Sequence, residues 1–122
     1  MRYINEDYCS EELSGMLMEK GYIGAANTYL DKDNLNVKQI TIQSAMKWLR
    51  EVHNLEIYPY HDMFQENNKW WYGIEKFTKG CSNCQYEEEP IYSTYEEACE
   101  AAIKYCLENL IQDEERRKIK SL

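Results

Sequence analysis

The cysteines Cys81 and Cys84 form the most specific chemical motif in this sequence of 122 residues. Two thiolates at C-x-x-C spacing can bind one tetrahedral Zn²⁺, and a structural site needs two further ligands. Cys9 or His61 could supply a ligand, or a second subunit could supply a matching pair. A redox C-x-x-C normally begins a helix, and no helix is predicted at residue 81. A zinc site, a redox pair and a loop with two incidental thiols stay open as alternatives, and no other cofactor is expected.

Residue patterns typical of enzymes are absent from the sequence. It lacks the phosphate-binding motifs GxGxxG and GxxxxGK[ST], the metalloprotease motif HExxH and the nucleophile motif GxSxG. Of its 2 histidines, His53 falls at a predicted helix end, where a structural role is favoured. His61 precedes Asp62, but adjacency in sequence does not bring two side chains together. We therefore predict that the protein is not an enzyme.

Three stretches of the sequence predict the helices that must position these residues. A short helix over 10–20 begins at Ser10, whose hydroxyl can cap it. A second helix begins at Thr41 and ends at Asn54, which tolerates a left-handed C-cap conformation. The last helix begins at the capping box of Thr94 and Glu97 and extends to about residue 111. Residues 22–40 are ambiguous between a loop and a further helical turn.

Strand patterns occupy the middle of the chain. Side chains alternate between apolar and aromatic over 55–63, aromatic residues fill 69–77, and 86–93 forms a weaker third strand. Proline cannot donate a ladder hydrogen bond and belongs on edge strands. Because Pro59 and Pro90 lie in the first and third segments, the segment 69–77 is expected to be the central strand of the sheet. A loop is expected between this strand and residue 85.

These elements predict an α+β fold of α-β-β-β-α order. Its three-stranded antiparallel sheet would be covered on one face by two helices, with a short N-terminal helical segment beside them. The expected organisation is an N-terminal helical segment and loop over 1–40, the α-β-β-β-α core over 41–112, and a charged C-terminal tail over 113–122. Cys99 and Cys106 fall on the apolar stripe of the last helix, so we predict that both are buried.

The predicted sheet presents an aromatic surface on the face away from the helices. If Leu55 and Ile57 face the helices, then Tyr58, Tyr60 and Trp71 face outward. Exposed aromatic clusters are typical of interfaces, so these three residues are candidates for partner binding or self-association, with a homodimer as the leading form. The alternative is that residues 1–40 fold over this face as ordinary core.

The α-β-β-β-α order and the closing segment STYEEACEAAIKYCLENL resemble the double-stranded RNA-binding domain. That resemblance implies RNA binding through lysines at the start of the final helix. The matching positions in this sequence are Tyr95, Glu96 and Cys99. Between residues 81 and 112 the only basic residue is Lys104, against seven glutamates, which repel a phosphate backbone. Nucleic-acid binding of this type is therefore a disfavoured alternative function.

Three segments are similar to small proteins encoded by bacterial prophages and mobile elements. They are CSEELSGMLMEKGY near the start, TIQSAMKWLREVHN in the middle and YEEACEAAIKYCLENLI near the end. This resemblance implies a genomic setting and no particular chemistry. Together with the composition, it favours a small non-enzymatic binding protein, with a zinc-stabilised module as the first alternative.

The charge balance narrows the class of partner. The chain has 14 Lys and Arg against 22 Asp and Glu, a net charge of −8, which disfavours nucleic acid and membrane surfaces. Glu87, Glu88 and Glu89, with the acidic face of the last helix, form one negative region. This region is either a solvated face or a docking surface for a basic partner, including a nucleic-acid-binding host protein for which it acts as a decoy.

No segment of the sequence indicates a membrane protein. The N-terminal residues lack the apolar core of a secretion signal, and no stretch approaches the ~18 apolar residues of a membrane span. We expect a cytoplasmic protein whose 5 cysteines are reduced.

Overall fold

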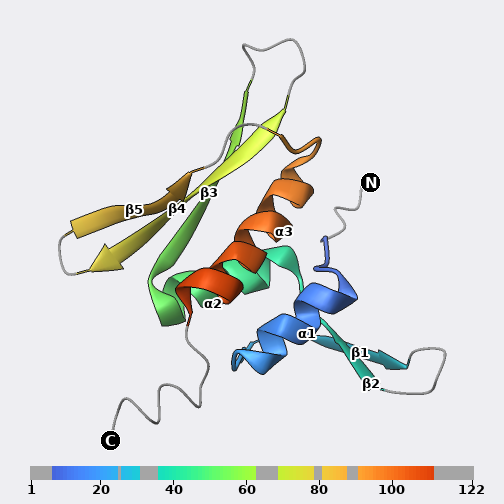
Figure 1. Ribbon diagram of the computed structural model, residues 1–122. Coiled ribbons are helices and arrows are strands. Elements are labelled where there is room, and N and C mark those ends of the chain that lie inside the picture. The colour runs from blue at the N-terminus through green and yellow to red at the C-terminus, as the bar shows by residue number, and fades with distance from the viewer. Residues whose placement is uncertain are drawn as a thin grey trace, which may run out of the picture.

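The computed structural model describes residues 7–24, 26–30, 36–62, 69–78, 81–87 and 91–111. Its helices and strands form two sheets and a group of helices around one core (Figure 1). In chain order they are α1 (Glu11–Glu19), β1 (Asn27–Leu30), β2 (Asn36–Gln39), α2 (Ile42–His53), β3 (Leu55–His61), β4 (Trp70–Thr78), β5 (Cys81–Glu87), α3 (Tyr95–Tyr105) and a π-helical turn (Cys106–Leu110).

Side-chain caps begin each of the three α-helices, as the sequence predicts. The Ser10 hydroxyl accepts the Leu13 N–H at 3.1 Å at the start of α1, and Thr41 does the same for Ser44 at 3.1 Å in α2. After α2 the chain turns at Asn54, whose φ of 57° is left-handed. The predicted C-cap is therefore confirmed, and it sends the chain directly from α2 into β3.

The capping box of α3 is formed with one change of partner. Thr94 accepts the Glu97 N–H at 3.1 Å, while the Glu97 carboxylate accepts the N–H of Ser93 at 3.1 Å, one residue before the cap. The helix then widens into the π-helical turn at Cys106, where the Ile111 N–H bonds the Cys106 carbonyl at 3.1 Å. The predicted helix therefore reaches residue 110 with a changed hydrogen-bond pattern in its last five residues.

The described residues form an α+β fold, as predicted, but the predicted arrangement of its sheets is wrong. The structure has three α-helices and a separate two-stranded antiparallel sheet of β1 and β2, in a region predicted as loop and helical turn. The predicted three-stranded sheet is wrong in its third strand, because β5 lies at Cys81–Glu87 and not at 86–93. From α2 to α3 the order of elements is α-β-β-β-α, so the departure from the predicted fold lies in the added β1–β2 sheet and in the position of the third strand.

Strands β3, β4 and β5 pair antiparallel in that order. The register joins Ile57 to Ile74 and Tyr60 to Trp71 between β3 and β4. Between β4 and β5 the register shifts at Ile74/Glu75, which is typical of a β-bulge. A further bridge joins Trp70 to Tyr92, where the predicted third strand would have continued.

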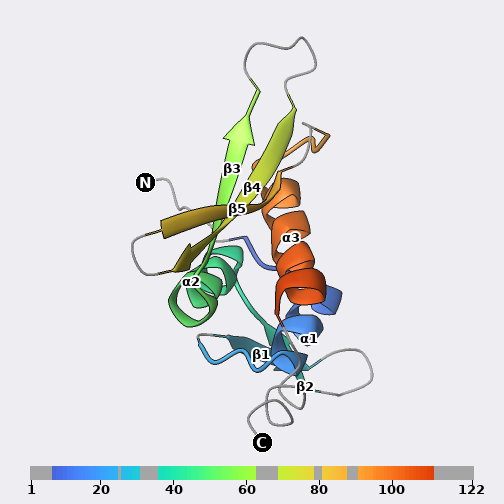
Figure 2. The ribbon, with the colours of Figure 1, turned by 60° about the vertical axis from the view of Figure 1, so that its left-hand side comes forward.

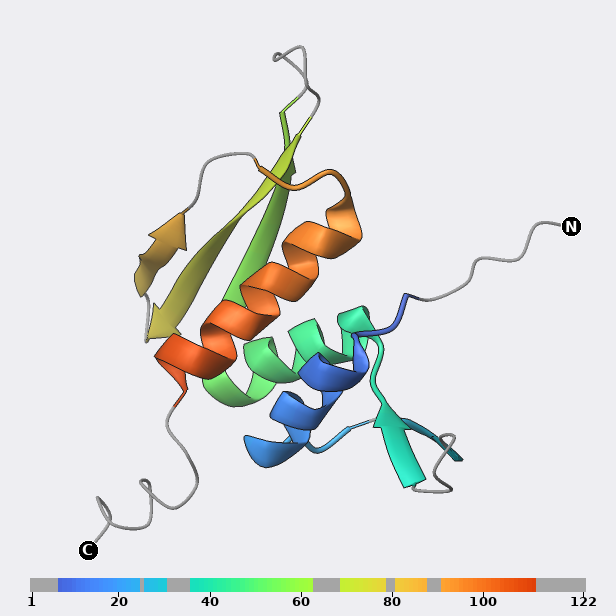
Figure 3. The same ribbon diagram turned by 45° about the vertical axis from the view of Figure 1, so that its right-hand side comes forward.

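The core lies between the sheet and the helices. Figure 3 shows α3 with the sheet on one side of it and α1 with the β1–β2 hairpin on the other. Helix α3 packs against β3 and β4, while α2 packs against β3 and α3. The fully buried side chains at its centre come from every part of the chain: Leu17, Ile40, Leu49, Leu55, Ile74, Ile103 and Leu107. In the described part of the chain, no helix is long and apolar enough to span a bilayer.

Candidate functional site

The outer face of β3 and β4 carries the aromatic side chains singled out in the sequence. Leu55 and Ile57 are buried, and the residues between and after them alternate toward the other face. The register places Tyr60 opposite Trp71, with Tyr58 two residues before Tyr60 on the same face. The structure therefore brings Tyr58, Tyr60 and Trp71 together on one surface.

These three rings stack into a continuous row, which we call the aromatic ladder (Tyr58, Tyr60 and Trp71). The Tyr58 and Tyr60 ring centroids lie 6.4 Å apart at an interplanar angle of 24°. The Tyr60 and Trp71 centroids lie 5.1 Å apart at 23°. Near-parallel rings at these distances support one another, and Tyr58 and Trp71, at the two ends of the row, each have one ring face that the stack does not use.

A glycine sets the position of the first ring. Gly73 is the register partner of Tyr58 and is buried although it has no side chain. A tyrosine opposite a glycine can lie across the strand because no Cβ opposes it. Gly73 adds no side chain to this face beside Trp71, so two of the three ladder residues come from β3 and one from β4.

Carboxylates border the aromatic ladder at one end. Glu56 and Glu75 are register partners on the same face as Tyr58. The pKa of Tyr58 is raised above its ordinary value, first by desolvation and then by the charges of Glu75 and Glu56. Glu56 also lies 3.6 Å from the Arg50 guanidinium. A cation that approaches the aromatic ladder would therefore meet the negative charges of Glu56 and Glu75. Glu56 already lies close to one cation, the Arg50 guanidinium.

The outer face is partly open to solvent. Tyr60 is 41% exposed and Phe77, on the same face of β4, is 37% exposed. Figure 2, in which the sheet comes forward, shows no described helix over this face, and α2 and α3 contact the sheet from the core side. The described part of residues 1–40 packs into the core and does not cover the ladder. Stacked rings with a carboxylate edge can bind a planar cation such as a guanidinium.

The predicted C-x-x-C loop is a strand. Cys81 and Cys84 lie in β5, paired in register with Thr78 and Glu75 of β4. The backbone at these two cysteines is therefore an extended strand and not the tight turn that a zinc knuckle uses. Among the described side chains, which do not include those of Cys81 and Cys84, no group of three or more His, Cys, Asp and Glu is placed to hold a metal ion. The zinc site stays a prediction from the sequence motif.

Only part of the predicted acidic region lies among the described residues. Glu87 ends β5, while Glu88 and Glu89 lie outside the described residues. On α3, the Glu97 carboxylate caps the helix, and the Glu100 carboxylate accepts the Ser10 N–H at 2.6 Å. Two carboxylates of the predicted acidic face, those of Glu97 and Glu100, therefore accept backbone hydrogen bonds that stabilise the fold.

The histidines pack against aromatic rings. His53 lies 4.6 Å from Trp48 in an edge-to-face arrangement, and His61 stacks on Trp70 with centroids 4.6 Å apart. Trp70 in turn meets the edge of Tyr95 at 5.4 Å. Both imidazoles thus have structural neighbours, as the sequence predicts for His53.

Three cysteines are buried thiols. Burial is the largest cause that raises the pKa of Cys9 to about 12, of Cys99 to about 11 and of Cys106 to about 12. The predicted burial of Cys99 and Cys106 is confirmed. At neutral pH all three stay protonated, so none is an activated nucleophile.

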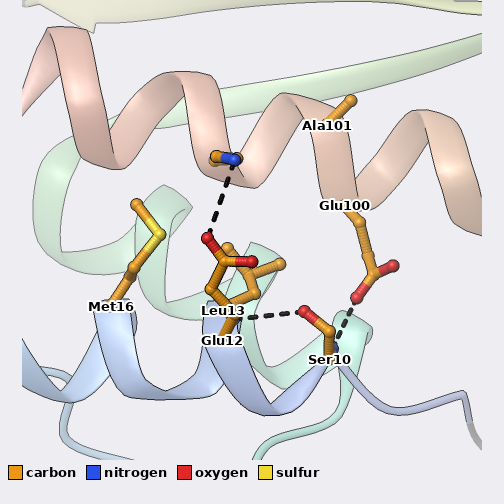
Figure 4. A pocket seen from close by; sticks show the side chains of 7 residues that line it. Ser10, Glu12, Leu13, Met16, Glu100 and Ala101 are labelled. Atoms are coloured by element: carbon orange, nitrogen blue, oxygen red, sulfur yellow. Dashed lines mark hydrogen bonds and ion pairs between the residues drawn. The ribbon is translucent and has the colours of Figure 1, made fainter.

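Two cavities were not predicted from the sequence. One of about 170 Å³ lies between α1 and α3, where Ser10 and Glu100 meet and Lys104 lies 3.9 Å from Glu12 (Figure 4). The other, of about 250 Å³, lies between residues 22–24 and α2. Each joins segments distant in sequence, and local patterns carry no signal for such pairs.

Comparisons of the chain with protein-family models, curated proteins and solved structures gave no match. The function is therefore inferred from the geometry of the described surfaces.

Proposed function

We propose that this protein is a non-enzymatic binding module that holds an arginine-containing segment of a basic partner protein on the aromatic ladder. The observation that carries the proposal is the stacked row of Tyr58, Tyr60 and Trp71 beside Glu56 and Glu75. A guanidinium stacks on ring faces and donates to carboxylates at the same time, whereas an ammonium is a compact point charge. The net charge of −8 steers a basic partner toward the protein.

A second copy of the chain fits this face less well. If two ladders pack parallel about a two-fold axis, the glutamates of one copy lie opposite those of the other. Like charges at an interface cost binding energy. A basic partner meets the same carboxylates favourably, so we assign the ladder to a different protein.

The alternative functions predicted from the sequence receive less support. Of the positions that would contact phosphates in an RNA-binding helix, Cys99 is buried, Tyr95 packs against Trp70, and Glu96 is a carboxylate. A zinc-stabilised module would need ligands beyond Cys81 and Cys84. The cytoplasm, the location expected from the sequence, is part of this proposal, as is an origin in a prophage or mobile element.

Calorimetric titration with an arginine-rich glycine–serine peptide tests the proposal. The arginine peptide should bind more tightly than its lysine counterpart, and a glutamine counterpart should not bind. Trp71→Ala should weaken binding about tenfold, because a partly desolvated cation–π contact is worth roughly 1–2 kcal/mol. Val52→Ala, which truncates a side chain 55% exposed on α2, is the matched control and should bind like wild type.

Two results would contradict the assignment. Equal binding of the arginine and glutamine peptides would show that no cation is recognised. Unchanged binding by Trp71→Ala would show that the cation is held elsewhere on this acidic protein.

A further inference from the structure

The cavity between residues 22–24 and α2 has an aromatic floor and a rim of apolar, hydroxyl and charged side chains. Trp48 and Tyr22 form the floor, with ring centroids 5.6 Å apart, and both are nearly buried. Val52 is 55% exposed at the rim, and Ile23 beside it is 86% exposed. An isoleucine this open to water, next to a hollow lined by aromatic rings, has the character of an interface side chain.

The backbone explains why Ile23 points outward. Tyr22 turns inward, and an added Cβ at Gly24 would lie 2.6 Å from the Tyr22 hydroxyl. The Tyr22 ring therefore fits only because residue 24 is a glycine. With Tyr22 directed inward, the next side chain, Ile23, is presented to solvent immediately beside the cavity.

The charges along the cavity are self-complementary. Lys47 and Glu51 both line it, and their side chains lie 4.0 Å apart while 64% and 61% exposed. If two copies of α2 pack antiparallel across a two-fold axis, Lys47 of each copy faces Glu51 of the other. With the axis between Ile23 and the cavity, the same operation brings each Ile23 to the cavity of the opposite copy.

We infer that this α2 surface binds a second copy of the chain, with Ile23 of each copy filling the Trp48–Tyr22 cavity of the other. A cavity of about 250 Å³ is large enough for a branched aliphatic side chain, since a cavity of roughly 150 Å³ accepts benzene. The dimer leaves the aromatic ladder free for its partner, so this inference stands independently of the proposed function.

Sedimentation equilibrium up to high micromolar concentration tests the dimer. Wild type should associate, and Ile23→Ser should raise the dissociation constant about tenfold or more, as expected for a central apolar anchor. Ile91→Ser is the matched control, because it truncates an isoleucine that is 55% exposed outside this cavity. A monomeric wild type, or an Ile23→Ser protein that associates as strongly as wild type, overturns the inference.

Charge reversal tests the two-fold geometry. Lys47→Glu and Glu51→Lys should each weaken self-association about tenfold at low salt, because each creates like-charge contacts across the axis. An equimolar mixture of the two single variants should form a heterodimer as tightly as wild type. Failure of the mixture to associate better than either variant alone overturns the antiparallel arrangement. Trp71→Ala should dimerise like wild type, which separates this test from that of the aromatic ladder.

Discussion

Burial determines what the described thiols can do. Cys106 has no exposed surface and lies where α3 passes into the π-helical turn, so its thiolate has no contact with water. Its pKa of about 12 in the folded protein lies above the ordinary value of 9.0. Between these two pH values the unfolded chain loses a proton that the folded chain retains, so the folded state is progressively destabilised as the pH rises.

We therefore expect the free energy of unfolding to fall from pH 9 toward pH 12, with Cys106 contributing up to about 1.4 kcal/mol per pH unit. Cys106→Val, which keeps an apolar side chain of similar size, should make the decline shallower. Urea denaturation of both proteins at several alkaline pH values measures the slope. Equal slopes in wild type and variant would contradict the assignment of this thiol as a contributor.

Residue alternation was enough to predict the outer face of β3 and β4. Leu55 and Ile57 are apolar at alternate positions, and this period of two is a local property that tertiary contacts rarely reverse. The structure places Tyr58, Tyr60 and Trp71 on the opposite face accordingly. The stacking order and the role of Gly73 were not predictable, because both depend on the register between two strands.

Helix ends were predictable because capping is local. Ser10, Thr41 and Thr94 each accept an N–H from three residues ahead, a bond that depends on a few neighbouring residues only. The end of α2 at Asn54 follows the same rule. The π-helical turn after α3 has no such local signal.

Asn54 gives a prediction for the α2–β3 junction. At a φ of 57° an alanine Cβ is strained, whereas glycine adopts this conformation freely. Asn54→Ala should therefore lower the free energy of unfolding by about 1 kcal/mol, and Asn54→Gly should lie within a few tenths of wild type. Urea denaturation midpoints measure both. An alanine variant as stable as the glycine variant would mean that the junction relaxes out of the left-handed region.

Two pairing events were not predictable from local pattern. Gly80, Ser82 and Asn83 favour a loop, yet Cys81–Glu87 pairs with β4 because the long β4 strand offers an edge for it. Similarly, β1 and β2 pair with each other although the sequence between them is rich in Asp and Asn. Strand β2 also packs against α1. In both cases the partner strand, and not the intrinsic preference of the residues, decides the conformation.

At the scale of the whole molecule, the N-terminal segment and the last helix are held together by contacts between distant residues. The Ser10 N–H donates to the Glu100 carboxylate at 2.6 Å, 90 positions away in sequence. Leu13 and Leu17 of α1 belong to the same core as Leu49 and Ile103. The described part of the segment 1–40, predicted as separate from the α-β-β-β-α core, therefore contributes to the same core as the described part of residues 41–112.

This shared core predicts one cooperative unfolding transition. The urea transition followed by tryptophan fluorescence, which reports on Trp48, Trp70 and Trp71, should coincide with the transition followed by the helical far-ultraviolet signal.

A substitution at the contact between α1 and α3 tests this cooperativity. Glu100→Ala should shift both transitions together and lower the free energy of unfolding by about 1 kcal/mol, because α1 loses a charge-assisted hydrogen bond. Glu108→Ala, which loses only a 3.9 Å ion pair to Lys104, should stay within about 0.5 kcal/mol of wild type. Separate transitions for the two signals, or a shift of the helical signal alone in Glu100→Ala, would show that α1 unfolds independently of the sheet.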